Sequence, residues 1–190
     1  MKKLSEIFTI SLGAILNRKK PKTEEEKVAK YKLFSMKNYE DNLEKNKYED
    51  FFSNSTLDEK TVKEGDLIFR LLYPIKVAYV TKELEGLLVP SQYCILRMQT
   101  NEHDAMFIKW YLESEQVDKQ ISPDIMNTAM PLITMGSTKE ILIPEVNIEK
   151  QKTIGKIVAS WEQEKKLTKQ WQKEQGKYYN EIIKKTIGGK

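Results

Sequence analysis

The chain has 190 residues, of which 39% are hydrophobic and 32% are charged, and its formal net charge is +4. This length is enough to bury one sizeable core. The single cysteine, Cys94, excludes an internal disulfide framework and fits a reducing compartment. Because no apolar run is long enough to span a bilayer and no signal peptide opens the chain, we expect a cytoplasmic protein without membrane contact.

The positive charge is concentrated in the last part of the chain. Residues 148–190 contain 11 Lys and five Glu, whereas the residues before them contain 21 basic and 23 acidic side chains. We therefore expect this body to contact nucleic acid only where basic residues gather locally. The best candidate is "NRKKPK", in which Arg18, Lys19, Lys20 and Lys22 can neutralise phosphates and release counterions. The alternative interpretation of this cluster is a solvated loop.

The first part of the body reads as strand and loop. Alternating and β-branched residues predict a strand in residues 3–15 that ends near Gly13, and a second strand in residues 30–36. Residues 38–55 are polar and lack apolar periodicity, which predicts a loop with a short helical turn.

The clearest strand signal is "VKEGDLIFRLLYPIKVAYV" in the middle of the chain. A Gly-Asp turn pair precedes a predicted strand at residues 67–72, Pro74 interrupts it, and a second strand is predicted at residues 76–80. Two further short strands are predicted around Pro90. Cys94, in the near-apolar "YCILR", is predicted to be a buried strand thiol.

Helical periodicity replaces strand periodicity in residues 103–121. They predict one compact helix capped by Asn101 or Asp104. Residues 129–144 return to loop and strand. The predicted fold class is thus α+β, with a predominantly β domain in residues 1–147.

A long helix is predicted in residues 148–187, followed by a tail at residues 188–190. The segment has no Pro and is rich in good helix formers. A helix of 40 residues spans about 60 Å, so its far end cannot pack on its own domain. Its apolar residues recur every three or four positions, as in a coiled coil, which predicts a partner helix. The predicted interface residues are Ile154, Ile157, Trp161, Trp171, Tyr178 and Ile182. The alternative, packing against the body, concerns only the first three of them.

The inventory of reactive side chains argues against catalysis. One His and one Cys cannot build a His/Cys zinc site, and His103 is predicted to be a surface imidazole. The chain has neither a dinucleotide-binding fingerprint nor a phosphate-binding loop. We therefore expect a protein that is not an enzyme and that needs no cofactor or metal.

Several stretches taken together resemble the specificity (S) subunits of type I restriction–modification systems. They are "KLSEIFTISLGA", "VKEGDLIFRLLYPIKVAYV", "FIKWYLESEQVDKQI" and "MPLITMGSTKEILIPEVNIEKQKTIGKIV", followed by the long helix. In the last of these, a strand closing in Ile143-Pro144 is followed by Gln151 and an isoleucine-rich helix start. No single motif is specific to this family. The order and spacing of the motifs across nearly the whole chain are specific.

The resemblance implies a non-catalytic subunit that reads DNA. Such subunits usually contain two target-recognition domains, each reading one half of a split DNA site and each followed by a long helix. The paired helices set the distance between the half-sites and dock methyltransferase subunits and, through them, the nuclease and translocase subunit. This chain has one such domain and one helix, so it resembles half a subunit, and the expected partner is a second copy or another half subunit. The alternative is a protein-interaction remnant or regulator that binds methyltransferase or another specificity subunit without reading DNA.

The residues that read DNA vary within this family and cannot be transferred by motif. On physical grounds we expect Arg70, Tyr73 and Lys76, which flank Pro74 between two predicted strands, to reach base edges from a loop. The alternative for Arg70 is an outward-facing strand residue. The family's Gly-Asp turn more often leads into a glycine-bearing segment, and "RLLYP" replaces it here.

Overall fold

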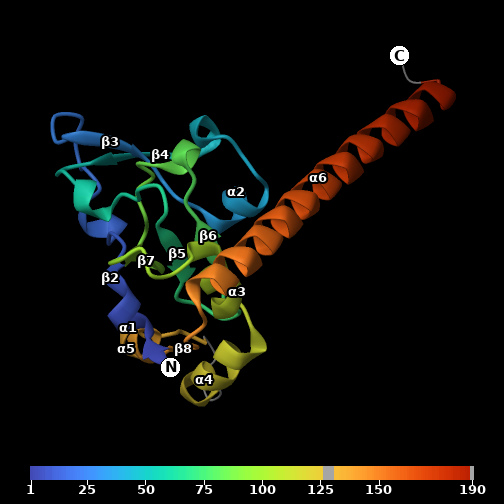
Figure 1. Cartoon of the computed structure of the whole chain (residues 1–190). Helices are drawn as coiled ribbons and strands as arrows, with labels where there is room; N and C mark the ends of the chain where they lie inside the picture. The colour runs from blue at the N-terminus through green and yellow to red at the C-terminus, as the bar shows by residue number, and fades with distance from the viewer. Residues whose placement is uncertain (126–130, 189–190) are drawn as a thin grey trace.

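The computed structural model describes residues 1–125 and 131–188 and shows a β-rich body from which one long helix projects (Figure 1). The strands are β1 (Lys2–Lys3), β2 (Phe8–Leu12), β3 (Ala29–Lys32), β4 (Asp50–Ser53), β5 (Leu67–Arg70), β6 (Val77–Tyr79), β7 (Tyr93–Met98) and β8 (Leu142–Ile143). The α-helices are α1 (Leu4–Ile7), α2 (Met36–Glu40), α3 (Ala105–Leu112), α4 (Glu115–Ile125), α5 (Met135–Glu140) and α6 (Ile148–Thr186). The α+β class predicted from the sequence is confirmed.

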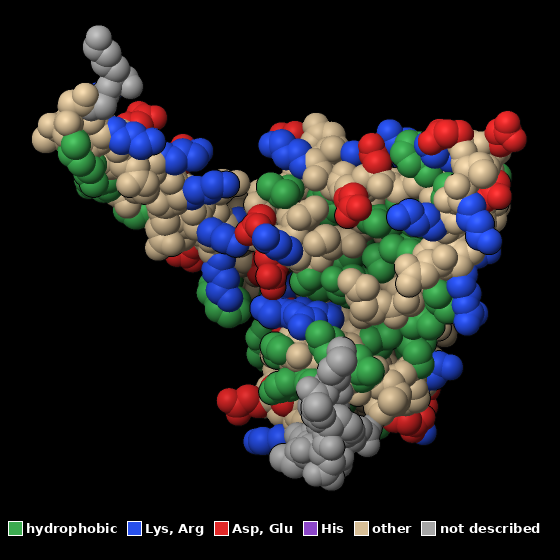
Figure 2. Space-filling model, turned by 180° about the vertical axis from the view of Figure 1, so that it is seen from behind, with side chains coloured by type: hydrophobic (Ala, Val, Ile, Leu, Met, Phe, Trp, Pro, Cys, Tyr) green, Lys and Arg blue, Asp and Glu red, His purple; other side chains and the backbone are tan. Residues whose placement is uncertain are grey.

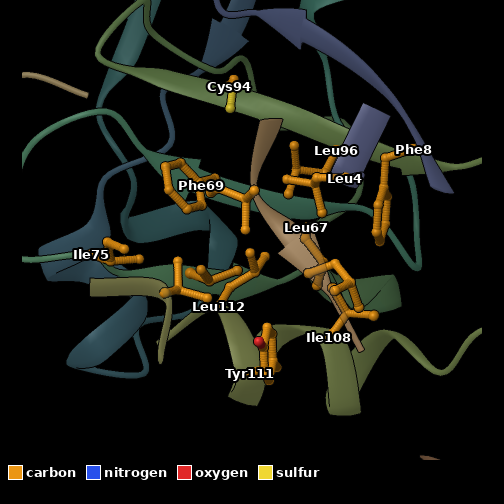
Figure 3. Close-up of a cluster of buried hydrophobic side chains, with 14 of the residues drawn as sticks. Leu4, Phe8, Leu67, Phe69, Ile75, Cys94, Leu96, Ile108, Tyr111 and Leu112 are labelled. Atoms are coloured by element: carbon orange, nitrogen blue, oxygen red, sulfur yellow. The ribbon is translucent and has the colours of Figure 1, made fainter. Parts of the chain in front are cut away.

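The centre of the body is a four-stranded antiparallel sheet in the order β2-β7-β5-β6. Alternate side chains of its strands enter two different cores, because successive residues of a strand point to opposite faces. Leu67 and Phe69 face a core that α3 covers, and Figure 3 shows Ile108 and Leu112 of α3 approaching them. Ile68, between them in β5, enters the core on the other face. The sheet is therefore buried on both sides.

Cys94 is a buried strand thiol, as predicted. It lies in β7 opposite Leu12 of β2 and Phe69 of β5, and it is fully buried. Burial raises the pKa of this thiol to about 12. The thiol is therefore protonated at neutral pH and serves as a small apolar core residue.

The strands predicted at residues 67–72 and 76–80 are present as β5 and β6, and the strand at 30–36 corresponds to β3. The prediction for residues 3–15 was wrong at its start, where residues 4–7 form α1. Leu4 and Ile7 are both buried, and one helical turn places residues three apart on the same side.

Residues 50–53 were predicted to be loop and form β4 instead. All four of its residues pair with β3, so a distant segment creates this strand. Around Pro90, only β7 forms a strand, and the residues before it make isolated bridges. Of the loop and strand predicted at residues 129–144, the strand is present as β8, whereas the loop contains α5; residues 129–130 lie outside the described residues.

The single helix predicted at residues 103–121 is divided into α3 and α4. Asp104, one of the two residues predicted to cap the helix, is the N-cap of α3. The side chain of Asp104 accepts a hydrogen bond from the Phe107 amide at 2.9 Å. Between the two helices, the Glu113 carboxylate accepts a hydrogen bond from the Val77 amide at 2.8 Å. This bond ties the break to the edge of the sheet.

The long C-terminal helix is confirmed as α6, with 39 residues. Its N-cap is Asn147, whose side chain accepts a hydrogen bond from the Glu149 amide at 2.8 Å. A helix of this length extends about 58 Å. Figure 1 shows that its outer half runs away from the body.

Candidate functional surfaces

The start of α6 is fixed to the body by buried polar contacts. Gln151 is only 1% exposed, and its amide nitrogen donates to the Val146 carbonyl at 2.7 Å while its oxygen accepts from the Asp104 amide at 3.1 Å. His103 lies 3.4 Å from the same side chain and is partly exposed, so the imidazole that was predicted to lie at the surface also contacts the start of α6. Gln151 therefore joins the N-terminus of α3 to the first turn of α6.

A buried lysine makes a second connection between α3 and α6. Lys109 is only 3% exposed, and its ammonium forms ion pairs with Glu113 at 3.0 Å and with Glu162 of α6. Burial acts to lower the pKa of Lys109, but the two carboxylates outweigh it and leave the pKa above its ordinary value. Lys109 was not among the residues predicted from the sequence; the signal for it was a lysine inside the apolar run "MFIKWYL".

Further along, α6 touches α2 and the residue after it. The Lys166 ammonium lies 5.3 Å from the centroid of the Tyr39 ring, and Lys169 pairs with Asp41 at 2.7 Å. Among the described residues, Lys169 is the last of α6 that forms a hydrogen bond or ion pair with the body. The remaining 17 residues of the helix, from residue 170 to its end at Thr186, project beyond these contacts.

The side of α6 that faces away from the body carries a row of apolar residues, which Glu164 and Gln175 interrupt. At 3.6 residues per turn, positions 151, 155, 158, 162, 166 and 169 share the side that packs on the body, whereas positions 157, 161, 171, 178 and 182 share the opposite side. Trp171 and Tyr178 are each 61% exposed, and Ile157 is 65% exposed. Figure 2 shows hydrophobic side chains along this edge of the helix. We call the exposed set the seam; it consists of Ile157, Trp161, Trp171, Tyr178 and Ile182.

Ile154 is placed differently from the other predicted interface residues. It falls between the two sides of α6, is partly buried, and packs against the main core. The contact with the body that was considered as its alternative is therefore present. Ile157 and Trp161, for which the same alternative was open, are exposed.

The basic cluster predicted at Arg18, Lys19, Lys20 and Lys22 lies on a short 3-10 helix, Leu16–Arg18, and the loop after it. The Lys19 carbonyl accepts a hydrogen bond from the Asn54 amide at 2.9 Å, which anchors the loop beside the end of β4. None of the four side chains forms an ion pair with a described residue.

Two of the acidic residues that follow the cluster in sequence form contacts that leave the side chains of the cluster unpaired. Glu24 pairs with Lys27 at 2.5 Å, and Glu26 accepts a hydrogen bond from the backbone amide of Lys22 at 2.7 Å. A shallow groove lined by Arg18 and Lys19 on one side and by residues 56–60 on the other adjoins the cluster. The positive charge here is thus available to an anionic partner.

The loop that was predicted to reach base edges lies between β5, which ends at Arg70, and β6, which begins at Val77. We call it the reading loop. Tyr73 is exposed, its backbone amide donates to the Pro131 carbonyl, and it precedes Pro74 through a cis peptide bond. Arg70 is half-buried, and Lys76 pairs with Glu40 at 3.1 Å. Tyr73 is therefore exposed, whereas the ammonium of Lys76 is engaged by Glu40.

The basic cluster and the loop between β5 and β6 start from neighbouring positions on the sheet, but their side chains lie on different parts of the body. The chain leaves β2 with Gly13 bonded to the Tyr93 carbonyl, and it leaves β5 with Leu71 bonded to the Gln92 carbonyl. Beyond these bonds, the basic cluster joins the end of β4 and the reading loop packs on residues 131–133. No described hydrogen bond or ion pair links the two groups.

β3 and β4 pair as a separate two-stranded antiparallel sheet, and one aromatic contact beside it was not predicted. The Lys27 and Lys30 ammonium groups lie 4.3 Å and 5.5 Å from the centroid of the partly exposed Phe52 ring. Both lysines also form ion pairs, Lys27 with Glu24 and Lys30 with Asp50, so they add little free positive charge to the neighbouring cluster. The contact between these lysines and Phe52 could not be predicted because residues 50–53 were expected to be a loop and form β4 instead.

The described residues contain no group of three or more His, Cys, Asp or Glu side chains that is suited to hold a metal ion. In the same part of the chain, no helix combines the length and the hydropathy that crossing a bilayer requires.

Comparison with known proteins gives matches only at the level of structure. No protein-family model matches the sequence, and no curated protein matches it. A chain from a study of complex assembly and conformational transition of the type I restriction–modification system superposes with a TM-score of 0.65 and 14% identity, over 98% of this chain and 48% of that one. The HsdS subunit from Thermoanaerobacter tengcongensis gives a TM-score of 0.64 and 15% identity, over 97% of this chain and 47% of that one.

The type I restriction–modification S subunit from M. genitalium gives a TM-score of 0.56 and 18% identity, over 99% of this chain and 44% of that one. The chain thus spans about half the length of each solved chain. This agreement confirms the resemblance seen in the sequence at the level of the fold. The chain has the fold of one half of a type I restriction–modification specificity subunit.

Proposed function

We propose that this protein is a non-catalytic, cytoplasmic DNA-recognition subunit of a type I restriction–modification system. Residues 1–147 form the target-recognition domain, residues 148–187 form a helix that pairs with a partner helix, and residues 188–190 are a tail. The complex recruits methyltransferase subunits and, through them, the nuclease and translocase subunit to a split DNA site.

The observation that carries this proposal is the division of α6 into two sides. One side is fastened to the body through Gln151 and Lys109, so the helix leaves the domain in a fixed direction. The other side exposes two tryptophans, a tyrosine and two isoleucines, and a large exposed apolar stripe is the usual sign of a protein interface. A rigid helix with an unpaired apolar seam suits a spacer between two recognition domains.

The partner of the seam is a second copy of the chain or another half subunit. Two identical chains related by a two-fold axis place equivalent recognition surfaces on inverted half-sites, so a homodimer reads a split palindrome. A different partner produces an asymmetric site. Either way, joining two modest DNA contacts strengthens binding well beyond a single domain.

The basic cluster supports DNA binding by the domain. Arg18, Lys19, Lys20 and Lys22 are free of ion pairs within the described chain, so they can contact phosphates and position the domain. Tyr73 and Arg70 are the candidates for contact with bases, whereas Lys76 must first leave Glu40.

The proposal is tested by the mass of the full chain in solution and by selection of duplexes from a randomised pool. Light scattering that gives a dimer, together with enrichment of two inverted half-sites at a fixed spacing, supports the homodimer. A monomer that dimerises only with a second specificity chain supports the mixed pair. A chain that retains no duplex selectively at any salt concentration, alone or paired, contradicts the proposed function.

A further inference from the structure

The side of α6 that packs on the body continues outward as a row of lysines. At 3.6 residues per turn, positions 166, 169, 173, 177 and 184 fall within about 80° of arc around the helix. We call these residues, Lys166, Lys169, Lys173, Lys177 and Lys184, the lysine row. Since its first two members contact Tyr39 and Asp41, the row faces the recognition domain.

The outer members of the row have charge available for a ligand. Lys173 and Lys184 are exposed and form no ion pair with any residue in the described ranges. Lys177 pairs with Glu174 at 2.6 Å, but both side chains are more than half exposed. An exposed pair of this kind is screened by salt and exchanges readily for another anion.

Lys166, Lys169 and Lys173 line one wall of an open notch between α6 and the body, and Lys177 and Lys184 continue the row beyond it; Figure 2 shows the notch in the space-filling view. The opposite wall at its base carries Glu40 and Asp41, and these are neutralised by Lys76 and Lys169. Glu174 also lines the notch and is paired with Lys177, so the uncompensated positive charge of the outer row comes from Lys173 and Lys184.

The composition of this side of the helix favours a polyanion over a protein. Protein interfaces are depleted in lysine and are built around apolar or aromatic anchors. Between Lys173 and Lys184, the row contains Lys177, and the other residue on this side is Asn180, so no apolar anchor is present. The seam, which has such anchors, lies on the opposite side of the same helix.

We propose that Lys173, Lys177 and Lys184 bind the phosphate backbone of duplex DNA that runs beside α6 between the two half-sites. This inference rests on the proposed function and assigns the helix a DNA contact of its own. The 11 residue steps from Lys173 to Lys184 cover about 16 Å. That length matches roughly five base-pair steps of 3.4 Å. The contact carries no sequence information because it reaches only phosphates.

The test compares two triple variants of the full chain that remove the same charge. K173Q/K177Q/K184Q removes the outer row, and the matched control K150Q/K152Q/K156Q removes three exposed lysines near the start of α6 that lie outside the row. Binding to a 40-base-pair duplex of random sequence is measured by fluorescence anisotropy between about 50 and 200 mM salt, the range over which phosphate contacts are resolved. Light scattering checks that the oligomeric state is unchanged.

We expect the row variant to lower the slope of log affinity against log salt by about 2 to 3, since each phosphate that a lysine neutralises contributes about 0.9 to that slope. The control should keep the wild-type slope. Equal slopes for the row variant and the wild type, or an equal loss in both variants, overturn the inference while the proposed function stands. A row variant that loses its protein partner but keeps its salt slope also overturns it, in favour of a protein ligand. A wild-type chain that binds no duplex overturns both.

Discussion

Gly155 of α6 and Asp104 at the start of α3 lie so close together that no side chain fits between them. A β-carbon added to Gly155 would lie 2.8 Å from Cγ of Asp104 and nearer still to Oδ1, and real β-carbons do not approach other atoms within 3.0 Å. Asp104 cannot simply turn away, because its carboxylate caps α3 by accepting from the Phe107 amide. The glycine therefore fixes the distance between the body and the helix.

Replacing this glycine tests the tight junction. Gly155→Ala should destabilise the protein by about 1 to 3 kcal/mol, as overpacking does in a close-packed interior. This loss should exceed the gain of up to about 1 kcal/mol that Ala brings to a helix. The control is Gly176→Ala, where no atom lies within 4 Å of the added β-carbon, and it should stabilise α6. Urea denaturation of both variants measures the difference; equal stability of the two would show that Asp104 yields freely.

Lys109 provides a second test of how α6 is held. Lys109→Met should cost about 3 to 5 kcal/mol at pH 7, because removal of one partner leaves Glu113 and Glu162 partly buried without their cation. Lys169→Met, which removes an exposed pair with Asp41, should change stability much less. If both variants unfold at the same urea concentration, the buried pair has no special role.

The pH dependence of stability follows from the sign of the Lys109 shift. A lysine whose folded pKa is raised contributes stability that is fully present below its ordinary pKa of 10.5 and is lost as the pH rises through the folded pKa. The difference in unfolding free energy between the wild type and Lys109→Met should thus be constant from pH 7 to pH 9 and shrink above pH 10.5. Urea titrations of both proteins at several pH values check this; a gap that widens with pH contradicts the assigned shift.

The basic cluster leads to a prediction about DNA. Replacing Arg18, Lys19, Lys20 and Lys22 with Gln should weaken binding to all sequences alike and lower the salt slope by about 0.9 for each phosphate that is no longer neutralised. The control changes four exposed lysines elsewhere on the body, Lys37, Lys63, Lys119 and Lys139, to Gln. Anisotropy titrations on one duplex at several salt concentrations separate the two. Identical slopes for the cluster variant and the control would show that the cluster is only a solvated loop.

The sequence predicted those parts of the fold that local pattern determines. The period of α6 and the run of good helix formers depend only on neighbouring residues, and so does the turn before β5, where Gly65 has a φ of 86°. β4 could not be predicted in this way, because "DFFS" becomes a strand only through pairing with β3, about 20 residues earlier. The same holds for the division of α3 from α4, which depends on a bond from Glu113 to β6.

The candidate surfaces were also predictable where they depend on local pattern, and not where they depend on contacts between distant residues. The seam was visible from its spacing, whereas the opposite side of the helix was not, since Gln151, Gly155 and Val158 acquire their role only by contact with the body. Ile154 shows the limit of the pattern: it fits the period of the seam, yet the helix turns it toward the core. Nothing in the sequence indicated the ion pair between Lys76 and Glu40, which lie far apart along the chain.

The seam itself gives the most direct prediction. Trp171→Glu combined with Ile182→Glu places two charges on the exposed apolar side beyond Lys169, where no contact with the body is broken. Helix pairing depends on apolar packing along such a seam, so the double variant should be monomeric at concentrations at which the wild type is paired. Its circular dichroism at low temperature should stay close to that of the wild type, which shows that the chain is still folded. The control, Gln170→Glu with Asn180→Glu, adds the same charge away from the seam and should remain paired. A control that dissociates equally would mean that net charge, and not the position of the seam, governs pairing.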